Sequence, residues 1–210
     1  MKKISHLVLF FFLFAGSFNA FSQEIGLRAG VNLSNLLIKD SEENGFKPGL
    51  NLGVIGEYPL TETIFVESGL LFSQKGTRYS ESEDGEKLTV KFGLNYLEIP
   101  IFAKLYHELD NDMQVFGSVG PYVGVGLNGK LKLKYSYDGD SESETESIDF
   151  GDDLKRLDYG LGIGAGVRKE NLQLGLNFNF GLANLDPDGD SDYRTSNLAI
   201  GVNFTYFLNK

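Results

Sequence analysis

The sequence predicts an all-β chain that folds as an eight-stranded, antiparallel, up-and-down transmembrane β-barrel. Three observations predict it. Apolar residues alternate with polar or small ones in nearly every strand-length run, short and long connections alternate along the chain, and an export signal precedes the runs. Successive side chains of a strand point to opposite faces, so each run has one apolar face and one polar or small face. In a membrane barrel the apolar face meets lipid.

The amino-terminal residues have the composition of a secretory signal peptide: a basic start, a short apolar run, and small residues before a cleavage site. These parts are, in order, Lys2 and Lys3, residues 7–15, and Ala20 and Ser22 before a cut at Gln23. The run is too short for a transmembrane helix, which needs about 20 apolar residues. We therefore expect a signal peptide over 1–22 and one outer-membrane barrel domain over 23–210.

Composition limits the classes of function. Removing the two signal-peptide lysines changes the formal net charge from −10 to −12, which disfavours nucleic acid as a partner. The sequence contains no cysteine, so disulfides, thiol catalysis and zinc–thiolate sites are excluded. No apolar run reaches 18 residues, so an integral membrane protein must cross by strands.

The alternating pattern predicts eight strands, each long enough to cross a bilayer at a tilt. They are expected over 24–33, 48–58, 63–74, 92–106, 113–127, 155–168, 171–182 and 197–207. Short turns are expected over 59–62, 107–112 and 169–170, and long polar loops over 34–47, 75–91, 128–154 and 183–196. Outer-membrane barrels have short periplasmic turns and long outer loops, and an even strand number places both termini in the periplasm.

Individual strands support an outward apolar face. Between Leu172 and Leu182 every second residue is leucine or phenylalanine, and the residues between them are polar or small. The glycines of the run 160–166 share one face, which suits a narrow interior filled by larger side chains from opposite strands. The alternation changes phase between Leu94 and Leu97, which predicts a β-bulge near Asn95 and Tyr96.

Several segments, in this order, resemble one known family. They are 26–34, 72–76, 94–100 (Leu-Asn-Tyr-Leu-Glu-Ile-Pro), 120–122 and 181–184. The chain is similar over 24–207 to the porin-like outer-membrane β-barrel family of Bacteroidetes that includes the PorT proteins. The resemblance implies an OmpA/OmpX-like barrel in the outer membrane, part of the cell envelope. Gly201, Phe204 and Tyr206 also resemble the carboxy-terminal signal read by the barrel assembly machinery.

Seven charged residues fall at inward positions of the predicted strands. They are Arg28, Glu57, Glu67, Glu98, Lys104, Asp158 and Arg168. Charges removed from water must be paired, so we expect an ion-pair network inside the barrel, most of it in the periplasmic half. A gated proton or ion path is the alternative interpretation of the same residues.

Catalytic and metal sites have little support. The two histidines are His6, in the signal peptide, and His107, in a predicted periplasmic turn, so a Ser-His-Asp arrangement at the outer rim is excluded. We expect no enzyme and no cofactor. Asp186, Asp188, Asp190 and Asp192 surround a glycine and form a weak calcium candidate, although the spacing differs from that of an EF-hand.

The sequence therefore predicts a non-enzymatic outer-membrane barrel with an envelope-structural role, or with a surface-binding role through its long acidic loops. Outer-membrane lipid, the barrel assembly machinery, and a surface protein or glycan are the expected partners. One alternative is a PorT-like accessory of transport or secretion. Another is a soluble periplasmic ligand-binding barrel, which would need an apolar interior and a polar exterior.

Overall fold

The computed structural model describes residues 23–38, 45–83, 86–109, 111–137, 140–189 and 194–209. Within these residues the chain forms nine β-strands. They are β1 (Glu24–Ile38), β2 (Gly45–Pro59), β3 (Ile64–Glu83), β4 (Glu86–Glu108), β5 (Met113–Tyr137), β6 (Asp140–Ile148), β7 (Leu157–Lys169), β8 (Leu172–Gly181) and β9 (Thr195–Phe207). The predicted signal peptide lies outside the described residues. No helix in the described part of the chain is long and apolar enough to cross a membrane.

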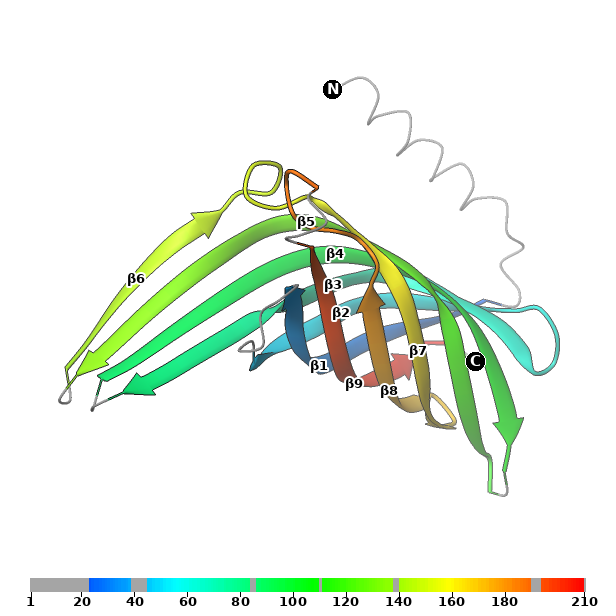
Figure 1. Ribbon diagram of the computed structural model, residues 1–210. Coiled ribbons are helices and arrows are strands. Elements are labelled where there is room, and N and C mark those ends of the chain that lie inside the picture. Colours follow the sequence, from blue (N-terminus) through cyan, green and yellow to red (C-terminus); the bar gives the residue numbers. More distant parts are fainter. Residues whose placement is uncertain are drawn as a thin grey trace.

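Eight of the nine described strands close into a ring. Antiparallel neighbours run β4-β3-β2-β1-β9-β8-β7-β5, and a further β4–β5 pairing closes the circle (Figure 1). β6 pairs with β5 alone among the described strands and stands outside the ring. The prediction of an antiparallel barrel is therefore confirmed, and the ninth strand is an addition to it.

The exterior of the ring is apolar. Large aliphatic side chains are about half exposed on every ring strand, for example Leu27, Val54, Leu70, Ile101, Val123, Leu161, Leu174 and Val202. Leu176 is the extreme case, with 61% of its surface exposed. A chain dissolved in water has no reason to display a continuous apolar belt, whereas lipid makes it favourable.

The two ends of the ring differ. Short turns join β2 to β3, β4 to β5 and β7 to β8 at one end, which we call the short-turn end. Asn111 and Asp112 have positive φ values of 64° and 57° in the second of these turns, a conformation that asparagine and aspartate tolerate better than most residues. β1 and β9 pair at this end through Gly26 and Phe207, so the chain enters and leaves the barrel side by side. We call the opposite end the long-loop end.

Two of the predicted long loops are wrong. Residues 75–91 and 128–154 mostly continue as strands: β3, β4 and β5 extend past the ring, and β6 folds back along β5. Together, residues 76–83, 86–95, 128–137 and 140–148 form a four-stranded antiparallel sheet that reaches away from the barrel (Figure 1). We call it the projecting sheet. The alternation Leu131-Lys132-Leu133-Lys134 on β5 is a usable sign of a strand, whereas β6 alternates glutamate with serine or threonine, which resembles a solvated loop.

The predicted bulge lies where expected, but its extra residue is on the other strand. The β4–β5 register shifts between Asn95 and Tyr96, and Leu127 of β5 is the residue without a partner. β4 itself keeps its phase, because Leu94 and Tyr96 both point inward and are fully buried. The apparent phase change arises because the interior becomes apolar at this height.

An apolar cluster fills the interior at the long-loop end. It contains Leu36, Leu94, Tyr96, Ile148, Phe150, Ala183 and Leu185, all buried. Phe150 comes from the segment predicted to be a solvated acidic loop, and its ring packs edge-on against Tyr96 at a centroid distance of 5.5 Å. These loops therefore contribute side chains that cover the barrel mouth.

If the exterior faces lipid, a charge placed there should be costly. Leu176→Arg, near the middle of β8, should lower the free energy of unfolding by about 2–4 kcal/mol in lipid vesicles. Asn177→Ala on the inner face should cost about 1 kcal/mol, because it removes the acceptor of the Asn203 side-chain hydrogen bond. Urea titration followed by the mobility shift of unboiled protein on gels measures both. Equal losses would contradict the assigned facing.

Candidate functional site

The structure places all seven predicted interior charges at inward positions and divides them into two groups. Arg28, Glu57, Glu67, Lys104 and Arg168 meet in the half of the barrel nearer the short-turn end. Glu98 and Asp158 lie nearer the long-loop end and share a cation that the sequence interpretation missed, Lys75.

A bidentate salt bridge between an arginine and a carboxylate anchors the first group. Arg28 donates from Nη1 and Nη2 to the two carboxylate oxygens of Glu67, each at 2.8 Å, and from Nε to Thr205 Oγ1 at 3.0 Å. Paired N–H donors matching two oxygens make this the most directional form of ion pair. The contact joins β1 to its neighbour β9 and to β3, which lies on the far side of β2.

Lys104 is the centre of the first group. Its ammonium contacts Glu57, donates to Glu67 at 3.0 Å and donates to Gln173 Oε1 at 2.7 Å. An ammonium has three protons, so these contacts use its donors fully. The ring of Phe116 lies 4.1 Å from its Nζ atom, which adds a cation–π contact on an otherwise apolar side.

Arg168 closes the group toward the short-turn end. It donates to Glu24 at 2.5 Å, and its Nη1 atom lies 3.6 Å from a Glu57 oxygen. Tyr106 donates to the same Glu57 oxygen at 2.8 Å. Sequence reasoning missed Glu24 as a member because it is the first residue of its strand, although its alternation with Gly26 and Arg28 places it on the inner face.

The second group is built around Lys75. Its ammonium contacts Glu98 and donates to Asp158 Oδ2 at 3.0 Å, and the Tyr122 ring lies 4.5 Å from it. Asn197 also donates to Asp158, at 2.9 Å. The predicted loop over 75–91 includes Lys75, but the alternation of this residue with Leu71 and Ser73 on β3 indicates an inward position.

The inward glycines of β7 make room for aromatic rings from the adjacent strand β5 and from β4 beyond it. A Cβ atom on Gly160, Gly162 or Gly166 would lie within 2.7 Å of Tyr122, Phe102 or Phe116, respectively. Interior space is correspondingly small. Two cavities of about 30 Å³ each flank Arg28, while a cavity of about 300 Å³ opens at the short-turn end beside Glu24 and Arg168. The middle of the described barrel is thus a packed polar core with room for single water molecules.

The other predicted site residues are only partly placed. Asp186 and Asp188 lie in the connection before β9, and Asp190 and Asp192 lie outside the described residues, so calcium binding stays a prediction. Phe204 and Tyr206 point outward and are each 47% exposed, whereas Gly201 points inward. His107 is exposed near the short-turn end of β4, away from both charge groups.

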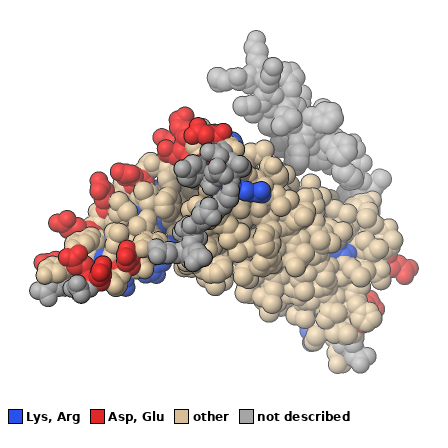
Figure 2. All heavy atoms as spheres, viewed as in Figure 1, with Lys and Arg blue, Asp and Glu red and all other residues tan. Residues whose placement is uncertain are grey.

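The projecting sheet offers a second candidate site. One of its faces continues the inner face of the barrel and combines apolar or aromatic side chains with carboxylates. We call it the acidic face; it comprises Tyr79, Glu81, Glu83, Glu86, Leu88, Val90, Phe92, Leu131, Leu133, Tyr135, Tyr137, Asp140, Glu142, Glu144 and Glu146. Acidic side chains gather along the upper edge of the sheet in Figure 2.

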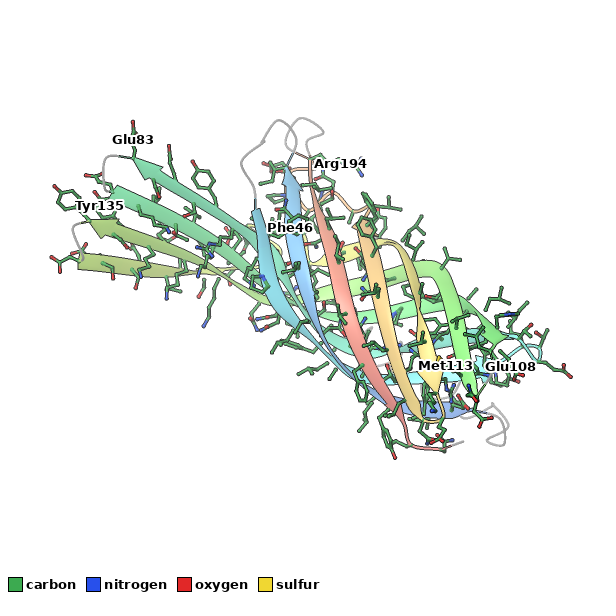
Figure 3. All side chains as sticks on the ribbon, turned by 90° about the horizontal axis from the view of Figure 1, so that it is seen from below. Phe46, Glu83, Glu108, Met113, Tyr135 and Arg194 are labelled. Atoms are coloured by element: carbon green, nitrogen blue, oxygen red, sulfur yellow. The ribbon has the colours of Figure 1, made fainter. Side chains whose placement is uncertain are left out.

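β6 forms one border of that sheet. It pairs with β5 over nine residues in a regular register, and among the described strands it has no neighbour on its other side. Lysine, proline and bulges, which commonly protect exposed edges, are absent from β6. Glu83 and Tyr135 mark the free tip of the sheet in Figure 3.

Comparisons with known proteins cover family models, curated proteins and solved structures. The family model for the outer membrane protein beta-barrel domain matches residues 20–186. A search of curated proteins found no match.

A comparison with solved structures found Neisserial surface protein A. Its sequence is 9% identical to this chain, and the TM-score is 0.45 over 87% of this chain and 96% of that chain. The comparison also found Ail, the attachment invasion locus protein of Yersinia pestis, 16% identical with a TM-score of 0.34 over 89% and 100%. A third structure, the N-terminal beta-barrel domain of Pseudomonas aeruginosa OprF, is 14% identical with a TM-score of 0.25 over 85% and 97%.

The Arg28–Glu67 pair can be tested by a double-mutant cycle. Arg28→Met leaves a buried carboxylate less compensated and should destabilise the barrel by about 3–5 kcal/mol. Arg28→Met with Glu67→Gln should recover part of that loss, because the surplus negative charge is removed. Arg78→Met, which removes an exposed arginine, should stay within about 0.5 kcal/mol of wild type. Urea unfolding in phosphatidylcholine vesicles provides the measurement, and simple addition of the two single effects would argue against the pair.

Proposed function

Since this chain belongs to the outer membrane protein beta-barrel domain family, we propose that its ring is an anchor and that its work is done by the projecting sheet, which presents a binding surface to a protein partner outside the cell. The orientation proposed here places the short-turn end in the periplasm and the long-loop end outside, as short periplasmic turns and long outer loops are typical of such barrels.

The observation that carries this proposal is the long unpaired border of β6. An exposed strand edge presents a row of free backbone N–H and C=O groups, and an extended segment of another protein can pair with it. The carboxylates of Glu142, Glu144 and Glu146 alternate along the same strand. A partner strand with basic residues at every second position would complement them, and Tyr135 and Tyr137 on the neighbouring strand supply aromatic contact area.

The packed interior supports anchoring rather than conduction. Eight-stranded barrels have an interior just wide enough to be filled by side chains, and here buried ion pairs and aromatic rings occupy it. A soluble ligand-binding barrel does not fit, because the polar side chains face inward and the apolar ones face outward. The resemblance of residues 94–100 to PorT-like proteins favours a secretion accessory as a second candidate.

Partner binding can be tested in intact cells with a photo-crosslinking amino acid at Tyr137. The wild-type chain should give a discrete crosslinked adduct. Glu142→Gln with Glu144→Gln and Glu146→Gln should lose most of it, because the complementary charges on β6 are gone. The matched control changes Asp149, Asp152 and Asp153 to asparagine, which alters the same amount of charge in the adjacent loop and should leave the adduct unchanged. Equal loss from both sets, or no adduct at all, would contradict the proposal.

A second measurement separates the anchor from a pore. Purified, refolded protein in a planar bilayer should stay near baseline current, because the interior around Lys104 and Arg28 leaves cavities of only about 30 Å³. Stable stepwise currents of porin size would contradict a filled barrel and favour a transport role.

A further inference from the structure

The second face of the projecting sheet is basic. Residues paired directly across neighbouring strands share a face, and here the register aligns Arg78 with Lys91 and Lys91 with Lys132. We define the basic face by its six cations, all exposed: Arg78, Lys87, Lys91, Lys130, Lys132 and Lys134. The other described positions on this face are Ser80, Ser82, Thr89, Gly93, Ser136, Ser141, Ser143, Thr145 and Ser147. Basic side chains appear along the lower edge of the sheet in Figure 2.

The arrangement of the cations is unfavourable for the protein alone. Like charges directly opposite each other in a sheet destabilise it, and Arg78, Lys91 and Lys132 form such a row over three adjacent strands. Among the described residues none of the six forms an ion pair. Lys47 adds to the repulsion. Its Cε atom lies 3.5 Å from the place that a Cβ atom would take on Gly93, and its positive charge repels that of Lys91. An anionic ligand would remove this cost.

The position of the basic face identifies the ligand. By strand phase it continues the lipid-facing exterior of β3, β4 and β5. Three rows follow one another up this surface: Phe72, Leu97 and Val125 are apolar, Gln74, Asn95 and Asn128 are amides, and Arg78, Lys91 and Lys132 are cationic. This order matches the layers of a bilayer. The apolar row suits the hydrocarbon core, the amide row suits the interface, and the cationic row suits anionic headgroups.

The spacing between rows is compatible with headgroup contact. Arg78 lies four positions after Gln74 along β3, which is about 13 Å of extended strand. Strand tilt shortens the rise along the membrane normal to about 10 Å. Lysine and arginine side chains are long and flexible enough to reach back toward the interface. Lys130, two residues above Asn128, lies closer still.

We propose that the basic face binds the phosphate groups of an anionic glycolipid in the outer leaflet, so that lipid and protein partner use opposite faces of one sheet. The serine and threonine hydroxyls between the cations supply further donors to phosphate or sugar oxygens. A second copy of the chain, docking its acidic face here, would have to reach the surface nearest the bilayer, so the lipid is the better-placed occupant. This inference rests on the orientation proposed above, with the long-loop end outside, but it does not depend on partner binding by the acidic face.

The test measures lipid binding to the full protein purified in a non-ionic detergent. The probes are lipid A with two phosphates and the same lipid A after enzymatic removal of both, with bound lipid counted by native mass spectrometry. Wild type should bind the phosphorylated form at least about tenfold more tightly, and Arg78→Gln with Lys91→Gln and Lys132→Gln should remove that preference. The preference should also shrink as salt is raised.

Two control variants and one competitor make the result specific. Glu142→Gln with Glu144→Gln and Glu146→Gln changes three charges on the opposite face, and Lys169→Gln removes a lysine at the short-turn end; both should keep the preference. The unboiled gel shift of each variant verifies that the ring is folded. Equal binding of both lipid forms, or equal loss in the Lys169→Gln control, would overturn the proposal. So would polyphosphate that binds as tightly as lipid A at the same phosphate concentration, because the face would then bind polyanions in general.

Discussion

The whole structure depends on the pairing of backbone polar groups where no water is available. In hydrocarbon each unpaired N–H or C=O costs several kcal/mol, so a sheet can cross only if it closes on itself. The β4–β5 pairing provides that closure here, and it joins the two longest of the described strands. Beyond the ring this requirement no longer applies, because water can satisfy an open edge. The ring therefore pairs its backbone groups by closing on itself in lipid, whereas the backbone groups on the open border of β6 can be paired by water.

Closure with only eight strands determines what the interior can contain. The space is narrow enough to be filled by side chains, and here ion pairs and aromatic rings fill its middle while an apolar cluster fills its long-loop end. Lys104 and Lys75 each hold two carboxylates, and each has aromatic rings against the rest of its ammonium. Buried ion pairs of this kind are weak contributors to stability, because desolvation offsets much of their attraction. The direction of the ammonium donors instead links strands that do not pair with each other, as the Lys104–Gln173 contact does for β4 and β8.

Much of the ring could be predicted from the sequence, because lipid imposes a strict alternation on every strand that crosses it. Leu172 to Leu182 shows that pattern in its simplest form. Lys75 was missed because the pattern weakens at the membrane edge, where an inward lysine looks like the start of a loop. Phe150 was missed for a different reason: it reaches the barrel mouth from a segment rich in aspartate. The charge groups could be predicted as inward residues, but their division into two clusters depends on cross-barrel distances that alternation does not contain.

Outside the membrane the alternation of side chains separates acidic residues from basic ones. The same strands that place leucine outward in the ring place lysine outward above it, and the phase runs through without interruption on β3 and β4. On β5 the single extra residue, Leu127, resets the phase, so that Lys130, Lys132 and Lys134 fall on the same side as Lys91. Without that bulge the three lysines would lie on the same face as the glutamates of β3 and β4. Neither face of the sheet would then carry charges of a single sign. A single inserted residue at the rim therefore separates the acidic face from the basic face.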